Sequence, residues 1–135
     1  MPFYSSPDHL YTSLGETLTR AQTHTPDAAR AVINAKLIIQ MRFTDPLAEL
    51  LVNGRKTPFQ IEYGPTKLRP ELELNLTADT FHQILLQELE IKTAVARGLI
   101  KVRGPVWKLA SFGPVIEAGQ QVYPLVLQDL GYRSK

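Results

Sequence analysis

The sequence predicts an α+β fold: a five-stranded, mostly antiparallel sheet with helices covering one face. Three observations support this prediction. Apolar residues recur at helical spacing over residues 1–34, alternate with polar residues in most of 36–76, and return to helical spacing afterwards. Turn signals such as Asn53-Gly54 and Gly64-Pro65 separate the alternating segments. Strands with one apolar and one polar face are typical of an antiparallel sheet packed on one side.

The composition indicates one ordinary domain, because 135 residues leave no room for two independent cores. The formal net charge of +2 is too balanced to indicate nucleic acid or an anionic membrane as the main partner. The absence of cysteine excludes disulfides, thiolate zinc sites and cysteine nucleophiles. There is no signal-peptide pattern, and no apolar run approaches the roughly 20 residues of a membrane-spanning helix. We therefore expect a cytoplasmic protein without stable membrane insertion.

Two helices are predicted in the N-terminal segment, residues 1–34. Ser6 is a suitable N-cap for the first helix, and Thr25-Pro26-Asp27 repeats the same start signal for the second. Gly15 inside the first helix is unfavourable for helix formation. The pattern leaves open whether these helices shield the sheet, cover a cavity or contact a partner.

The sheet and its first helices are predicted within residues 35–112. Strands are expected over 36–43, 48–52, 57–63, 72–76 and 99–103, with Asn53-Gly54 as a tight hairpin turn. Thr77 is expected to cap a helix, and Gly98 to end a short one before the fifth strand. A further helix is expected after Gly104-Pro105, with the apolar residues Val106, Leu109 and Ala110 on one side and Trp107 beside them.

The C-terminal segment, residues 113–135, has apolar residues at helical intervals from Val115 to Leu130. Pro124 lies in the middle of this pattern and is expected to kink or split the helix, because proline removes a backbone hydrogen bond and crowds the preceding turn.

A search for catalytic or metal-binding residues favours none. No two of His9, His24 and His82 stand at metal-ligand spacing, and His82 is expected on the surface or hydrogen-bonded. Glu71 and Glu73 share the polar side of their strand, and no phosphate-binding glycine motif occurs. The cations Lys101, Arg103 and Lys108 are interpreted as solvated surface. We expect no enzyme activity, no metal and no cofactor.

The stretch from about Leu72 to Phe112 resembles the sterol carrier protein (nonspecific lipid transfer) family. The similarity lies in a strand, a polar turn with Asp and Phe opening a helix, a second short helix, a Gly-hydrophobic-Lys-hydrophobic-x-Gly segment and a helix ending near Leu and Phe. These appear here as Leu72-Glu73-Leu74-Asn75-Leu76, Thr77-Ala78-Asp79-Thr80-Phe81, Ala94, Gly98-Leu99-Ile100-Lys101-Val102-Arg103-Gly104, Lys108-Leu109 and Phe112. The resemblance implies a sheet and helices that enclose an apolar tunnel for sterols, fatty acids or acyl chains.

The function expected from this resemblance is non-catalytic binding and transfer of a lipid-like ligand in an internal cavity. Tyr123 is the best candidate for a single polar contact to a head group. The residues expected to line the cavity are Ile39, Met41, Leu74, Phe81, Ile84, Leu85, Trp107, Phe112, Ile116, Val122, Tyr123 and Val126.

The alternative is an interaction or accessory module of the same fold with a filled core. Such a module would form a homodimer or bind a partner protein through its C-terminal helix. Truncation after Gly113 is then expected to abolish assembly.

Overall fold

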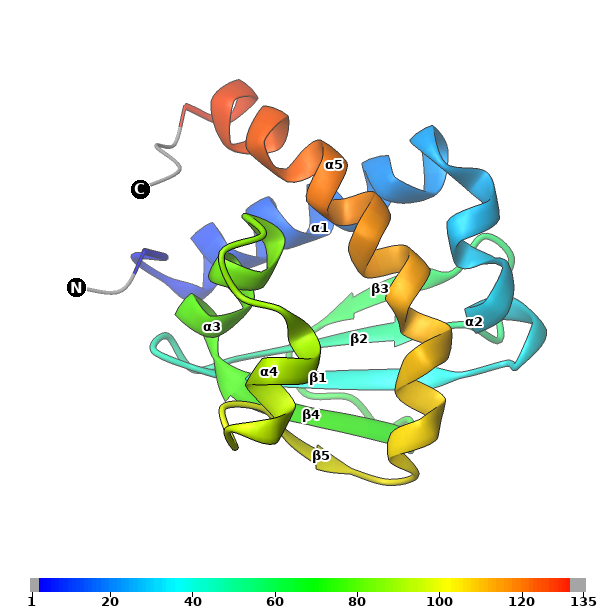
Figure 1. Ribbon diagram of the computed structural model, residues 1–135. Helices are drawn as coiled ribbons and strands as arrows, with labels where there is room; N and C mark the ends of the chain where they lie inside the picture. Colours follow the sequence, from blue (N-terminus) through cyan, green and yellow to red (C-terminus); the bar gives the residue numbers. More distant parts are fainter. Residues whose placement is uncertain (1–2, 132–135) are drawn as a thin grey trace.

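The computed structural model describes residues 3–131, and its centre is a five-stranded sheet (Figure 1). The spatial order of the strands is β3-β2-β1-β4-β5. The first two and last four residues of the predicted N- and C-terminal segments lie outside the described residues. The strands are β1 (Ile38–Thr44), β2 (Ala48–Asn53), β3 (Gln60–Tyr63), β4 (Leu72–Thr77) and β5 (Lys101–Arg103).

The pairing of β1 with β4 at the centre of the sheet is parallel, with Met41 opposite Leu74. The three other pairings are antiparallel, so the predicted mostly antiparallel sheet is confirmed. Alternate residues of the central pair point into the core on the same face. The buried residues on this face are Ile39, Met41, Phe43, Leu72, Leu74 and Leu76.

Helices cover this apolar face of the sheet, and the opposite face has no helix over it in Figure 1. The long helices α1 and α5 pack against each other across the layer. The helical elements are α1 (Pro7–His24), the 3₁₀-helix η1 (Pro26–Ala29), α2 (Arg30–Asn34), α3 (Ala78–Leu85), α4 (Ile91–Ala96), the 3₁₀-helix η2 (Val106–Phe112) and α5 (Gly113–Asp129).

The helix boundaries follow the predicted capping signals. Ser6 accepts a hydrogen bond from the backbone N–H of His9, and Thr77 accepts one from Thr80. Gly98 has a φ of 74°, the left-handed conformation that commonly ends a helix. Local capping chemistry therefore fixes where α1, α3 and α4 begin or end.

The predicted hairpin is present, because β2 and β3 pair antiparallel, but Asn53-Gly54 does not form a two-residue turn. The strand β3 begins only at Gln60, so the connection is several residues longer than a tight turn. Gly54 has another role, because a Cβ there would lie 2.6 Å from the carbonyl oxygens of both Val32 and Leu37. Glycine is required at this position for close backbone packing, which produces the same sequence signal as a turn.

Pro124 does not split the C-terminal helix, since α5 is continuous from Gly113 to Asp129. The proline lies on the exposed side of α5. The carbonyl that loses its helical partner there can bond to water instead, so the cost of the proline is reduced.

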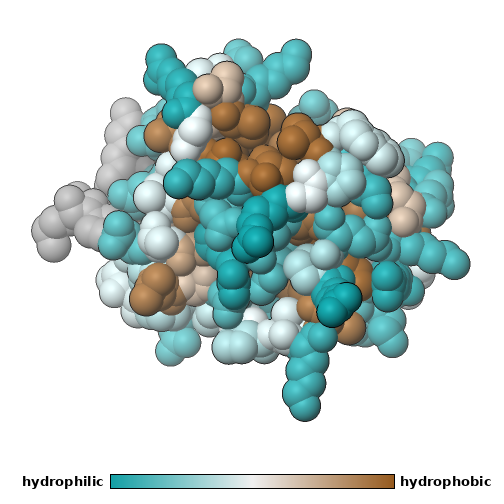
Figure 2. Space-filling view, turned by 90° about the horizontal axis from the view of Figure 1, so that it is seen from below, coloured by the Kyte–Doolittle hydropathy of each residue, from teal (hydrophilic) through white to brown (hydrophobic). Residues whose placement is uncertain are grey.

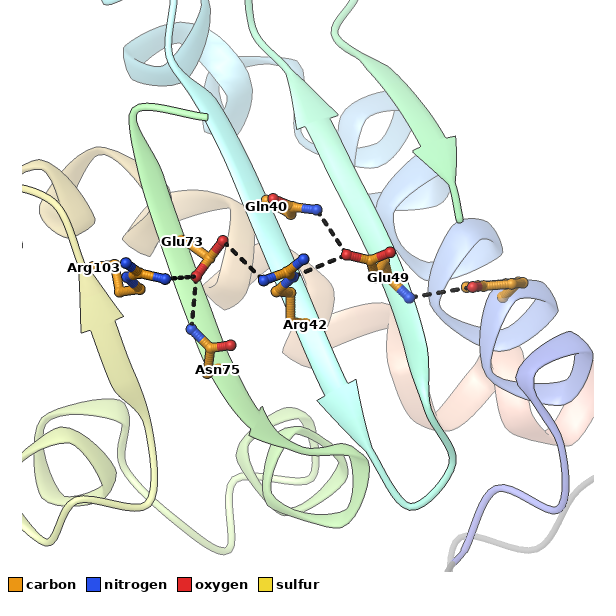
Figure 3. A network of polar contacts seen from close by, with 7 residues as sticks. Gln40, Arg42, Glu49, Glu73, Asn75 and Arg103 are labelled. Carbon is orange, nitrogen blue, oxygen red and sulfur yellow. Dashed lines mark hydrogen bonds and ion pairs between the residues drawn. The ribbon is translucent and has the colours of Figure 1, made fainter. Parts of the chain in front are cut away.

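The uncovered face of the sheet carries a network of charged and polar side chains (Figure 3). Arg42 of β1 reaches Glu49 at 2.9 Å and Glu73 at 3.6 Å, while Arg103 of β5 reaches Glu73 at 3.7 Å. The pairing of β5 with β4 places Arg103 opposite Glu73 and Lys101 opposite Asn75. In Figure 2, which looks onto this face, hydrophilic surface covers the centre and apolar surface gathers at the upper edge.

Candidate functional site

An apolar groove opens between α4, η2 and the first turns of α5. Its volume is about 410 Å³, within the range typical of small-molecule sites. Ile84 and Ile116 form its floor, and both are buried in the main hydrophobic core. The groove is therefore the outer end of the apolar interior. Its other lining residues are Glu90, Ile91, Lys92, Leu109, Ala110, Gly113, Glu117 and Gln120.

The polar residues of the groove are distributed along its rim. Glu90, Lys92 and Glu117 are exposed, so their charges remain in water. The side chain of Gln120 donates a hydrogen bond to the backbone carbonyl of Ile84 at 2.9 Å, linking α5 to α3. A polar rim over an apolar floor suits a ligand with an apolar body and a polar end.

The structure brings most of the predicted lining residues together in the core. All of them except Trp107 are buried, and the set divides between the sheet, α3, η2 and α5. Only Ile84 and Ile116 of this set also line the groove. Four other lining residues were not predicted: Ile91, Leu109, Ala110 and Gly113. The first three lie in the short elements α4 and η2, where the periodic signal is weak, and Gly113 begins α5 without a side chain that would mark a face.

Trp107 departs from the expectation of an enclosed side chain, since it is 75% exposed. The cause is the helix type. In a 3₁₀-helix the residues three apart share a face. In η2 this places Leu109 and Phe112 together toward the core, and Trp107 with Ala110 on an exposed face. Val106, the first residue of η2, is also exposed.

A buried polar cluster joins the N-terminal segment to α3 and α5. The hydroxyl of Tyr123 lies 2.6 Å from Nδ1 of His82 and is also hydrogen-bonded to the hydroxyl of Tyr4. Burial raises the pKa of both phenols well above their ordinary value, so both are neutral at physiological pH. Tyr123, the expected head-group contact, is therefore engaged by protein groups.

Phe3 closes this cluster from the N-terminal side. Its ring stacks on His82 with centroids 3.8 Å apart, and its backbone N–H donates to a carboxylate oxygen of Asp79 at 2.9 Å. His82 is thus buried and hydrogen-bonded, as expected. Sequence reasoning missed the roles of Phe3 and Tyr4, because the pairing partners of Tyr4 lie far along the chain.

Two other depressions on the surface differ from the groove in their lining. One, of about 470 Å³ near the β1–β2 turn, mixes polar lining residues such as Arg42, Glu49 and Asn75 with apolar ones such as Phe43 and Leu47. Another, of about 440 Å³ between α1 and α5, is lined by Arg20, Thr23, His24, Gln121, Val122 and Leu125. The groove beside α4 is more apolar than either of these two.

The described residues contain no group of three or more His, Asp or Glu side chains placed to hold a metal ion. Over residues 3–131, no helix has both the length and the apolar character that a membrane span requires.

Comparison with known proteins identifies the fold through solved structures. No family model matches the chain, and no curated protein matches its sequence significantly. The sterol carrier protein 2 of Yarrowia lipolytica, in its apo form, is similar with a TM-score of 0.59 and 17% identity, covering 78% of this chain and 88% of that one.

Two further structures extend this comparison. The palmitated SCP2L2 of Aedes aegypti has a TM-score of 0.59 and 17% identity, covering 78% of this chain and 92% of that one. UbiJ-SCP2, a ubiquinone synthesis protein, has a TM-score of 0.53 and 10% identity, covering 69% and 77% of the two chains. The resemblance found in the sequence is thus confirmed for the fold, and this chain has the architecture of the sterol carrier protein 2 domains.

Proposed function

We propose that this protein binds a lipid-like ligand in the groove between α4, η2 and α5 and releases it without chemical conversion. The ligand class that we propose first is an acyl chain. The observation that carries the proposal is the continuity between the groove and the core. Ile84 and Ile116 belong to both, so an apolar ligand in the groove contacts the interior of a fold shared with sterol carrier proteins.

The entry of the ligand requires side-chain movement at the floor of the groove. The predicted deeper lining, such as Met41, Leu74 and Phe81, is packed in the core of the structure. We propose that these residues accommodate the far end of the chain after Ile84 and Ile116 move apart. Met41 supports this step because methionine adapts its shape at low cost.

The expected affinity is moderate. Burial of about ten methylenes at roughly 0.8 kcal/mol each contributes about 8 kcal/mol. Association costs on the order of 4–15 kcal/mol in lost freedom and ordering, which offsets much of this gain. A carrier must release its cargo as well as capture it, so moderate affinity suits the role.

The polar end of the ligand is assigned to the rim of the groove. Tyr123 is engaged with His82 and Tyr4, whereas the ammonium group of Lys92 is exposed at the groove. A carboxylate or phosphate head group at Lys92 stays in water, where its charge is solvated.

The test is a titration with a fluorescent palmitate probe. Ala110 lines the groove and is exposed, so Ala110→Trp fills the groove without disturbing the core. Ala35→Trp is the matched control, because Ala35 is also exposed and lies outside the groove lining. We expect the first variant to lose probe binding and the control to keep it. Equal binding by both variants, or no binding by the wild type, contradicts the proposal. Palmitate recovered after incubation with the protein should be unaltered in mass, because no chemical conversion is proposed.

The alternative function, an accessory module, is favoured by one observation. Leu125 of α5 is 56% exposed beside the depression between α1 and α5. Truncation after Gly113 cannot test it, because α5 supplies Tyr123 and Leu127 to the core. Leu125→Arg is the appropriate variant, with molar mass in solution as the readout. A dimer that Leu125→Arg dissociates supports the module, and a monomeric wild type contradicts its homodimeric form.

A further inference from the structure

The positive charge of the chain is concentrated in one stretch. Residues 91–116 contain five Lys and Arg residues and no Asp or Glu. The rest of the chain contains ten Lys and Arg residues and thirteen Asp and Glu residues. The net charge of the whole chain is therefore small, although positive charge is concentrated in residues 91–116. The five cations are Lys92, Arg97, Lys101, Arg103 and Lys108.

The same stretch carries exposed apolar side chains at both ends of the edge strand β5. Leu99 precedes β5 and is 42% exposed, while Val106 and Trp107 follow it and are 54% and 75% exposed. We name as the basic edge the set Leu99, Lys101, Arg103, Val106, Trp107 and Lys108. In Figure 2, apolar surface gathers at the upper edge of the view, the side that faces the reader in Figure 1, where α4 and β5 lie.

The cations of the basic edge are only partly neutralised by the protein. Arg103 and Lys108 face Glu73 and Glu71, at 3.7 Å and 3.1 Å. Lys101 is exposed and forms no ion pair within the part of the chain that the structure describes. The pair of Arg103, whose side chain is 77% exposed, is weak and exchanges readily for other anions, whereas the pair of Lys108 with Glu71 is partly buried.

Trp107 is placed as an interfacial residue rather than as a core residue. Its ring is solvent-exposed, and the ammonium group of Lys108 lies 5.6 Å from the ring centroid. Tryptophan is favoured at the head-group level of a bilayer, where its apolar ring and its N–H group are both accommodated.

We infer that the basic edge docks reversibly on an anionic lipid bilayer, with Leu99, Val106 and Trp107 at the head-group level and the cations against lipid phosphates and carboxylates. The docking is peripheral and involves no membrane-spanning segment. Leu109 and Ala110 continue η2 into the groove, so the same orientation brings the groove to the bilayer surface.

A bilayer fits the basic edge better than a nucleic acid does. Phosphate backbones attract the cations, yet they offer no favourable contact to exposed Leu99 and Val106. A membrane interface accepts both kinds of side chain at once, and the attraction amounts to about fivefold in affinity for each cation near the surface.

The test uses the intrinsic fluorescence of Trp107, the single tryptophan of the chain, together with flotation on vesicles. Phosphatidylcholine vesicles are compared with vesicles that also contain phosphatidylserine, without any transported ligand. We expect a blue shift of the emission and cofloating with the anionic vesicles only, both weakened by salt. Because no acyl ligand is involved, failure of this test leaves the proposed cargo binding untouched, and the reverse also holds.

Matched variants locate the surface. Lys101→Gln should weaken binding to anionic vesicles about fivefold. Lys56→Gln, which removes another exposed lysine elsewhere, should not. Likewise Val106→Ser should weaken flotation, and Leu47→Ser, at an exposed leucine of the β1–β2 turn, should leave it unchanged. The inference is overturned if the emission does not shift, if neutral vesicles bind equally well, if nucleic acid binds in their place, or if the two lysine variants behave alike.

Discussion

The hydroxyl of Tyr123 on α5 lies 2.6 Å from Nδ1 of His82 on α3, in the interior on the helical side of the sheet. The same hydroxyl is bonded to Tyr4, so a single phenol connects the N-terminal segment with both helices. Such a buried polar group is costly unless its partners are present.

Removal of this central hydroxyl tests the cost directly. Tyr123→Phe leaves Nδ1 of His82 and the hydroxyl of Tyr4 without their shared partner, and should lower the free energy of unfolding by about 1–3 kcal/mol. Tyr4→Phe should cost less, because Tyr123 then keeps its bond to His82. Urea unfolding of both variants measures the two losses. A Tyr123→Phe variant as stable as the wild type contradicts the role given to this cluster.

The two buried phenols also predict alkaline sensitivity. Burial raises the pKa of Tyr4 and Tyr123 above the ordinary value of about 10. Above about pH 10 the unfolded chain loses phenol protons that the folded chain keeps, so the free energy of unfolding falls as pH rises. Below about pH 10 both states keep these protons, and the contribution of the phenols to stability is fully retained. Urea midpoints between about pH 8 and about pH 11 should fall more steeply for the wild type than for a Tyr4→Phe, Tyr123→Phe double variant. Identical slopes argue against this linkage.

Gly15 is explained by its contact with Tyr63. A Cβ at Gly15 would overlap the Tyr63 hydroxyl and lie 3.0 Å from its Cζ. Alanine for glycine within a helix normally stabilises by about 1 kcal/mol. We expect Gly15→Ala to show this gain only when Tyr63 is replaced by Ala. Thermal unfolding of the double-mutant cycle measures the coupling, and additive effects would disprove the contact.

The ion pairs on the uncovered face should contribute little to stability. Arg103 is largely exposed and lies 3.7 Å from Glu73. Arg103→Ala should therefore lower the free energy of unfolding by less than about 1 kcal/mol, and added salt should reduce the difference. A loss of several kcal/mol in chemical denaturation would show that this network holds the sheet together.

The sequence predicted the sheet because each strand has a strong local signal. Alternation in β4 and the caps Ser6 and Thr77 depend on neighbours within a few residues, and the structure confirms them. In β1 burial alternates only from Met41 onward, because Ile38 and Gln40 are buried as well. Gly54 was misinterpreted for the opposite reason. Its close neighbours Val32 and Leu37 lie far along the chain, and local sequence does not reveal a backbone approach of that kind.

The candidate site was less accessible to sequence reasoning. Its floor, Ile84 and Ile116, follows from helical periodicity, whereas its walls come from short elements such as η2. A 3₁₀-helix shifts the period from 3.6 to 3, which moves Trp107 to the surface. The partnership of Tyr4 with Tyr123 spans 119 residues and has no local signature.

The most direct test of ligand binding is an NMR measurement of contacts between palmitate and methyl groups of the protein. We expect intermolecular contacts from the acyl chain to the methyl groups of Ile84, Leu109 and Ile116, which line the groove beside α4. Contacts confined to Val122 and Leu125, in the depression between α1 and α5, would contradict it, as would the absence of any contact with palmitate.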